Sequence, residues 1–162
     1  MTGLLRARLP LAACLLMAAL HGFARAEESL IWTEKANEGF VSLSYASLDT
    51  AKAPVFLLSC FGEMGIAVLD VRKEIEGAKS GDPLTIALSA GEAKAEVEGE
   101  AMSDDATGMI FAEASDIAVK PVLEVLRQAG PVTVNMGTTS APLSDKGRAQ
   151  AVERFAKDCA LD

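Results

Sequence analysis

Alternating apolar and polar positions recur along most of the chain and predict a protein built mainly of short β-strands. The clearest alternations are residues 41–45 (VSLSY) and 93–98 (AKAEVE), where every second side chain is apolar. Short apolar runs bounded by Gly, Pro, Asp or Ser are typical of more deeply buried strands. We expect a short strand or ordered arm around residues 30–32, and strands at 41–45, 54–60, 66–71, 83–88, 93–98, 109–112 and 131–137.

Helical spacing occurs twice, and both times in the last third of the chain. The first helix carries an apolar stripe over residues 122–126 and begins either at Pro121 or at Asp116, in which case Pro121 would kink it. Gly130 can end this helix. The second helix is expected to use Ser144 as its N-cap and to place Ala151, Val152, Phe155 and Cys159 on its apolar face, with Gly147 weakening its first turn.

This order of elements, β-rich first and then helix, strand and helix, predicts one α+β domain. The sheet should be mainly antiparallel, because its strands follow one another through short turns. The pattern leaves open whether the strands form a sandwich or a partly closed barrel, with one short helix and a C-terminal helix beside it. No internal repeat is visible in the sequence.

The first 26 residues have the layout of an export signal. A short basic region precedes an apolar stretch at residues 9–20, and Ala24-Arg25-Ala26 provides a small-x-small cleavage pattern. We therefore expect cleavage after Ala26, release into the periplasm, and a single exported domain at residues 27–162. The apolar stretch is too short for a transmembrane anchor, which needs about 20 residues. Cys14 lies inside this stretch, which argues against lipidation there.

Removal of the signal makes the protein strongly acidic. The 162-residue chain has 15 basic and 23 acidic residues. Three of the arginines lie in the signal, which leaves 12 basic against 23 acidic residues and a formal net charge of −11. Such a charge repels phosphate backbones and argues against nucleic-acid binding. The single histidine, His21, also lies in the signal, so the mature chain has no imidazole for catalysis or for metal binding.

Two cysteines, Cys60 and Cys159, remain in the mature chain. An even pair in an exported protein predicts a disulfide. It would close a loop of about 100 residues and contribute up to about 4.7 kcal/mol in the chain-entropy model. The alternative, a redox pair, has little support because the chain has no Cys-x-x-Cys motif and only Lys157 as a cation beside either cysteine.

Several other residues were weighed as sites, and each has a simpler structural interpretation. The segment 104–108 (DDATG) is rich in oxygen ligands but lacks the spacing of a calcium loop, which favours an Asx-type turn. Scattered methionines favour core filling over copper binding. Gly137–Ser140 lacks the Gly-Lys-Ser/Thr ending of a phosphate loop, and Ser144 and Lys146 lack the spacing of a serine–lysine hydrolase. The methionines in question are Met64, Met102, Met109 and Met136.

One acidic row remains open to two interpretations. Glu96, Glu98 and Glu100 are spaced two residues apart, so in a strand they share one face. They are expected to form the solvated face of an edge strand, where charge discourages aggregation. The alternative is a surface that faces a basic partner. Trp32 and Tyr45 are the aromatic residues suited to contacts with carbohydrate or protein.

Part of the chain, residues 55–159, resembles small exported proteobacterial proteins. The resemblance is carried by Leu57-Leu58-Ser59-Cys60, by the helix–glycine–strand step at residues 125–134, and by the closing pattern of Leu143-Ser144-Asp145-Lys146-Gly147 followed by Ala151, Phe155 and Cys159. It is similar to the invasion-associated locus B family and to type VI secretion-associated proteins of VasI type. The chain departs from the first in its single cysteine pair and acidity, and from the second in lacking a Trp-rich middle.

The resemblance implies a β-rich, exported, envelope-associated accessory protein and transfers no catalytic residue. The sequence itself agrees, because it shows no constellation suited to catalysis, no metal ligands and no cofactor motif. We therefore expect an exported accessory or binding protein without enzymatic activity that acts on an envelope protein partner through an interaction surface. The alternative is a histidine-free hydrolase of an envelope polymer that uses paired carboxylates.

Overall fold

The computed structural model describes residues 29–62 and 66–159. The predicted export signal with Cys14 and His21, and most of the expected turn at 62–65, lie outside these residues. In the described chain, nine antiparallel strands form one sheet in the order β1-β2-β3-β4-β7-β6-β5-β8-β9. The elements are β1 (Leu30–Asn37), β2 (Phe40–Ser47), β3 (Phe56–Phe61), β4 (Ile66–Val71), β5 (Pro83–Ala90), β6 (Ala93–Ser103), β7 (Ile110–Ser115), α1 (Val119–Leu126), β8 (Val132–Met136), β9 (Thr139–Leu143) and α2 (Arg148–Asp158).

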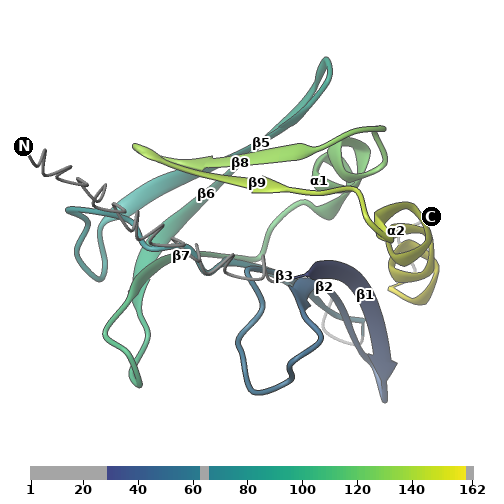
Figure 1. Ribbon diagram of the computed structural model, residues 1–162, viewed down its shortest axis with the longest axis horizontal. Helices are drawn as coiled ribbons and strands as arrows, with labels where there is room; N and C mark the ends of the chain where they lie inside the picture. Colours follow the sequence, from purple (N-terminus) through teal and green to yellow (C-terminus); the bar gives the residue numbers. More distant parts are fainter. Residues whose placement is uncertain (1–28, 63–65, 160–162) are drawn as a thin grey trace, which may run out of the picture.

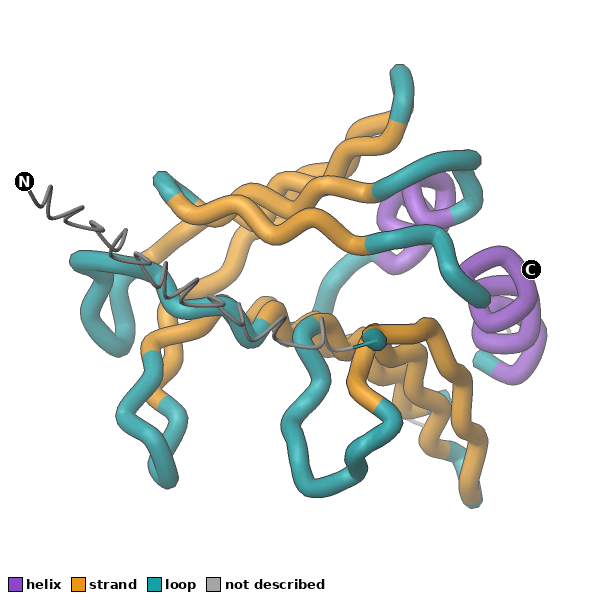
Figure 2. The backbone as a smooth tube through the Cα atoms, viewed as in Figure 1, coloured by secondary structure: helices purple, strands orange, loops and turns teal. Residues whose placement is uncertain are grey.

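The sheet curls into a half-barrel, with β1–β3 on one side and β8 and β9 on the other (Figure 1). Both helices lie at the open side of this curl (Figure 2). The predicted fold class, a mainly antiparallel β-rich domain with a short helix and a C-terminal helix, is confirmed. Of the two predicted arrangements, the partly closed barrel is present, because all nine strands belong to one sheet.

One face of the sheet is buried beneath the helices, and we call it the inner face. It includes Leu43, Leu58 and Leu69, which lie directly opposite one another on β2, β3 and β4 and are fully buried. Helix α1 contacts β5 and β6, whereas α2 contacts β1, β2 and α1. Each fully buried Leu or Phe contributes about 1.5–3 kcal/mol of transfer free energy. The opposite side of the sheet, which the helices leave uncovered, is the outer face.

Strand β6 changes its pairing partner along its length. Its residues 93–100 pair with β5, and its residues 100–103 pair with β7. A Cβ atom at Gly99 would clash with the carbonyl oxygen of Glu113, so only glycine allows this close approach of β6 to β7. In the sheet order β6 lies between β5 and β7, but residues 93–98 pair with β5 alone, so the predicted edge holds for this part of the strand. The outermost strands are β1 and β9.

Both helices begin at residues other than the predicted ones, α1 at Val119 and α2 at Arg148. Helix α1 contains Pro121 in its first turn, and Asp116 has φ of 55°, so the helix does not begin at Asp116. Helix α2 begins at Arg148 with Gly147 as N-cap, so the prediction that Ser144 caps it is wrong. Gly147 has φ of 81°, and a Cβ there would lie 3.2 Å from the Trp32 carbonyl oxygen, which favours glycine at the cap.

Ser144 instead joins the two ends of the sheet. Its carbonyl oxygen accepts a 2.6 Å hydrogen bond from the Trp32 indole, and its hydroxyl accepts one of 3.1 Å from Tyr45. Next to it, the Lys146 carbonyl accepts a 3.2 Å hydrogen bond from the Trp32 amide. The segment between β9 and α2 therefore bridges to β1 and β2. Strand β9 itself was not predicted from the sequence; Pro142 within it suits an edge strand, because proline cannot donate to a further strand.

The predicted disulfide between Cys60 and Cys159 is confirmed. Cys60 lies on the inner face of β3 and Cys159 at the C-cap of α2, with their Cα atoms 6.0 Å apart. Both residues are buried. The bond thus fastens the C-terminal end of α2 to the sheet, 99 residues away in sequence.

Replacing Cys60 and Cys159 together by alanine should lower the free energy of unfolding by about 3 kcal/mol, because the unfolded chain regains the freedom that the loop removes. Denaturant titration of the oxidised mature protein and of the variant measures this difference. Reductant should lower the stability of the wild type to that of the variant and leave the variant unchanged. Equal stabilities of oxidised wild type and variant would contradict the role given to the disulfide.

Candidate functional site

The outer face carries a row of three carboxylates at directly paired positions on central strands. Asp70 of β4 lies opposite Glu113 of β7, and Glu113 lies opposite Glu100 of β6. Like charges at directly opposite positions of antiparallel strands destabilise a sheet. The ladder between β4 and β7 has only four residue pairs and joins the two halves of the sheet. The carboxylate row therefore crosses two ladders of only four residue pairs each, β4 with β7 and β7 with β6.

Asp70 is the most perturbed member of this row. Burial raises its pKa to about 6, and the charge of Glu113 together with a hydrogen bond to the Glu113 carboxyl adds to the rise. Its Oδ1 atom is buried and makes no hydrogen bond. The charge of Arg72 lowers the pKa of Asp70. The Nη1 atom of Arg72, however, forms an ion pair with Asp104 at 2.7 Å. The Arg72 guanidinium also lies 4.4 Å from the centroid of the Phe111 ring, which holds it beside the row.

A shallow hollow of about 360 Å³ adjoins the row. The exposed side chains of Glu96, Glu98 and Glu100 continue the negative charge along β6, as their spacing predicted. We call the surface formed by Asp70, Glu113, Glu100, Glu98 and Glu96 the acidic face. The hollow itself is lined by Gly81, Pro83, Glu98, Gly99, Glu100, Glu113 and Ser115.

The acidic face is not arranged as a metal centre. Within residues 29–62 and 66–159, no three His, Cys, Asp or Glu side chains converge closely enough to hold an ion. Oxygen ligands around Ca²⁺ must lie within 2.3–2.6 Å of one point, whereas these carboxylates are spread along the ladder. What this arrangement can do is attract cationic groups over an extended area.

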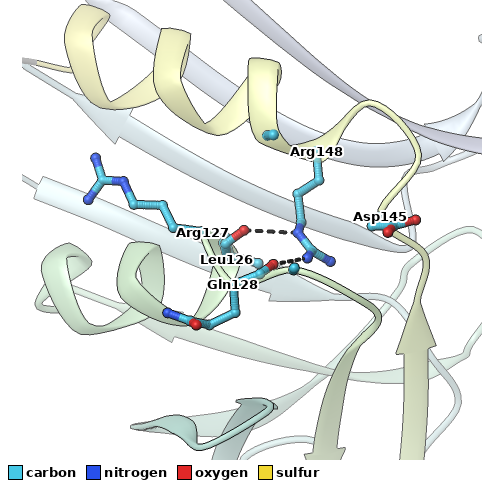
Figure 3. A pocket seen from close by; sticks show the side chains of 7 residues that line it. Leu126, Arg127, Gln128, Asp145 and Arg148 are labelled. Atoms are coloured by element: carbon cyan, nitrogen blue, oxygen red, sulfur yellow. Dashed lines mark hydrogen bonds between the residues drawn. The ribbon is translucent and has the colours of Figure 1, made fainter.

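A second hollow, of about 280 Å³, lies where the C-terminal end of α1 meets the start of α2 (Figure 3). Arg148, which is 2% exposed, extends from α2 across the end of α1. Its guanidinium donates to the carbonyl oxygens of Leu126 at 2.9 Å, Gly130 at 2.6 Å and Gln128. The Leu126 carbonyl belongs to the last turn of α1, where carbonyls have no partner within the helix, and Gln128 and Gly130 lie in the turn that follows. Arg148 therefore closes α1 and fixes the two helices to each other.

The electrostatics of this second hollow also point to a structural role. Burial lowers the pKa of Arg148, and Asp145 opposes that effect. The Nη1 atom of Arg148 is buried without a hydrogen-bond partner, so it is closed to a ligand in the hollow. The remaining lining comes from Leu126, Arg127, Gln128, Ala129 and Ala149. We therefore assign this region to the core of the fold.

The other residues weighed from sequence take structural positions. Asp104 Oδ1 accepts hydrogen bonds from the amides of Ala106 and Thr107 and from the Thr107 hydroxyl, so the segment 104–108 forms the expected Asx-type turn. These bonds lower the pKa of Asp104. Met136 fills the core, whereas Met64 lies outside the described residues. Met102 lies on β6, Met109 precedes β7, and Gly137 with Thr138 forms the exposed turn from β8 to β9.

Trp32 and Tyr45 are not available for surface recognition. Their side chains are buried, with ring centroids 5.2 Å apart, and Trp32 also contacts the Phe56 ring at 5.2 Å. Asp70 and Glu113 were not among the site residues predicted from the sequence. One signal was present: Asp70 interrupts an otherwise apolar strand, Ile66–Val71, and a carboxylate in such a run requires a structural or functional reason.

Comparison with known proteins finds similarity among solved structures but not among sequences. No protein-family model matches the chain, and no curated protein matches its sequence. Among solved structures, invasion associated protein B from Bartonella henselae is similar, with a TM-score of 0.45 and 16% identity over 81% of this chain and 95% of that chain. The printed name of this neighbour is that of the first family the sequence resembles, and the likeness to VasI-type proteins stays a prediction. This similarity assigns no function to the chain.

Neither helix in the described part of the chain has the length and apolarity needed to cross a bilayer.

Replacing Asp70 by asparagine should stabilise the protein above the pKa of Asp70 and have little effect below pH 3.8. Between pH 3.8 and about 6 the folded protein keeps a proton that the unfolded chain has lost, so stability falls as the pH rises and the full penalty is present above pH 6. We expect a gain of about 1 kcal/mol, less than full linkage gives because the carboxyl is partly exposed.

Denaturant titrations across this pH range measure the effect, with the exposed Asp105→Asn variant as control. An Asp70→Asn gain that is the same at every pH would contradict the ionisation argument.

Replacing Arg148 by methionine should lower the free energy of unfolding by about 3 kcal/mol, because three carbonyl oxygens lose their donor in a buried place. Arg127→Met is the matched control. Arg127 has an exposed ion pair with Glu153, so its loss should cost less than about 1 kcal/mol. Thermal and denaturant unfolding compare the two variants, and similar losses in both would refute the capping role of Arg148.

Proposed function

We propose that this protein is an exported, non-catalytic accessory protein of the bacterial periplasm that binds a basic protein partner through its acidic face. The observation that carries the proposal is the row Asp70, Glu113 and Glu100 on three adjacent central strands. The buried disulfide supports export to an oxidising compartment. A predicted signal cleaved after Ala26 would deliver the chain there.

The carboxylate row lowers the stability of the folded protein. Opposed like charges weaken the sheet, and the pKa of Asp70 is raised to about 6 because the folded protein resists its ionisation. Arg72, the basic group that acts on Asp70, is already bonded to Asp104. A partner that brings lysine or arginine side chains to the outer face would neutralise this repulsion. Such complementarity favours rapid and specific association.

A protein surface suits the geometry better than a small molecule does. The charges extend over β4, β7 and β6, and the hollow beside them is shallow and lined mainly by polar groups and glycine. Pockets for small molecules are usually enclosed and apolar. The acidic face therefore fits an extended, positively charged protein surface, which we propose belongs to the cell envelope.

A second candidate is a histidine-free hydrolase, and one observation favours it. Asp70 and Glu113 are two carboxyls in hydrogen-bond contact, with the pKa of Asp70 raised, and such pairs can divide acid and base roles. Glycosidases, however, hold their carboxyls about 5 Å or more apart, which leaves room for a sugar or a water. Release of reducing ends or of peptide amines from envelope polymers by wild type, but not by Asp70→Asn, would establish this alternative.

Capture from the native envelope with tagged mature protein tests the binding proposal. The wild type should recover and crosslink one stoichiometric partner with a basic surface. Added salt should reduce the amount of partner recovered. The double variant Glu100→Gln, Glu113→Gln should recover it at least tenfold less well, a conservative estimate for removing two charges from the interface. The same variant should be more stable than wild type, because the opposed charges are gone.

Loss of binding together with gain of stability separates a functional role from misfolding. Glu124→Gln, an exposed change on α1, is the matched control and should bind as the wild type does. Equal recovery by wild type and double variant would overturn the acidic face as the binding surface.

A further inference from the structure

We infer that the binding surface continues from the acidic face onto an exposed apolar row, so that the partner supplies a segment with a bulky apolar side chain ahead of its basic side chains. This inference rests on the proposed function and specifies the partner. The apolar row consists of Phe40, Phe61 and Ile66, which lie directly opposite one another on β2, β3 and β4.

The apolar row is exposed in a way that its neighbours on the inner face are not. Phe40 is 36% exposed and Ile66 is 37% exposed, while Phe61 lies between them with its ring centroid 5.2 Å from that of Phe40. Three adjacent large apolar side chains form a contiguous patch, unlike the isolated exposed Leu48. Contiguous patches of this kind mark interaction sites more often than scattered residues do.

The sheet fixes the distance between the apolar row and the carboxylates. Asp70 follows Ile66 by four residues on β4, and both side chains point to the outer face. At about 3.3 Å per residue this separation is about 13 Å. Between the two rows the outer face carries Ser42, Ser59 and Val68, which lie directly opposite one another. Because these side chains are small, no bulky group interrupts the path from the apolar row to the carboxylates.

Charge decides which occupant fits this surface. A second copy of the chain would bring its own acidic face against the first, and an anionic lipid surface would be repelled in the same way. The cation beside the carboxylates is Arg72, which is bonded to Asp104, and Lys35 lies farther away on this face, opposite Ser42. A partner segment with lysine or arginine over Asp70 and Glu113 and an aromatic or aliphatic side chain over the apolar row satisfies both parts.

Two synthetic peptides test this partner chemistry on the mature protein. One carries a phenylalanine four residues before a Lys-x-Lys pair, which matches the separation of the rows in an extended chain, and the other has serine in place of the phenylalanine. Fluorescence anisotropy at low salt compares their affinities. The phenylalanine peptide should bind about tenfold more tightly, as expected for partial burial of one aromatic side chain.

Surface variants assign that gain to the apolar row. The double variant Phe40→Ser, Ile66→Thr should bind both peptides equally, whereas Leu48→Ser, an exposed apolar change outside the surface, should keep the tenfold preference. Unfolding temperatures identify any variant that fails to fold. If the double variant fails, the single Ile66→Thr variant replaces it and should reduce the preference for the phenylalanine peptide.

The possible outcomes separate this inference from the proposed function. If both peptides bind equally to wild type and lose affinity in the Glu100→Gln, Glu113→Gln variant, the acidic face binds cations and the apolar extension is wrong. If neither the peptides nor an envelope partner depends on the carboxylates, the proposed function fails as well. Self-association that Ile66→Thr abolishes would assign the apolar row to a second copy and overturn the inference.

Discussion

Packing of the two helices against the inner face of the curled sheet is the arrangement on which the rest of the structure depends. Helix α2 is held at its start by Arg148, which binds the end of α1, and at its end by the disulfide to β3. Between these points Val152 and Phe155 are fully buried. The inner face is therefore filled, and any function that uses the sheet must use its outer face.

The outer face carries charged groups that lower the stability of the sheet. A sheet selected for stability alone would not place Asp70, Glu113 and Glu100 opposite one another at the short ladder between its two halves. The fold tolerates this row because the halves are also joined through Trp32, Ser144 and the helices. Groups that lower stability without an internal role are expected where a protein meets its partner.

Much of the fold could be predicted from sequence, because period-two alternation and short apolar runs directly reflect burial in strands. The disulfide also followed from composition and compartment. What the sequence could not supply was strand order: the charged outward residues of β6 predict an edge, which holds for residues 93–98 alone, because residues 100–103 pair with β7. Strand β9 was missed because Pro142 and small polar residues conceal its pattern. Ser144 has the chemistry of an N-cap, but long-range bonds to Trp32 and Tyr45 determine its position instead.

The candidate site was predictable only in part. The spacing of Glu96, Glu98 and Glu100 shows that they share a face, but it contains no information about which strand lies beside them. Asp70 and Glu113 belong to strands that are adjacent only after the chain has passed through the loop, β5 and β6. Their pairing is thus a property of the topology, and it turns a solvated strand face into a continuous acidic surface.

The central claim is that recognition takes place on the outer face of the sheet. Backbone amide NMR shifts of the mature protein, titrated with the phenylalanine and lysine peptide, test it most directly. Perturbations should be concentrated in β2, β3, β4, β6 and β7, with the helices unaffected. Perturbations centred on the junction of α1 and α2, around Arg148, would contradict it and would assign binding to the second hollow.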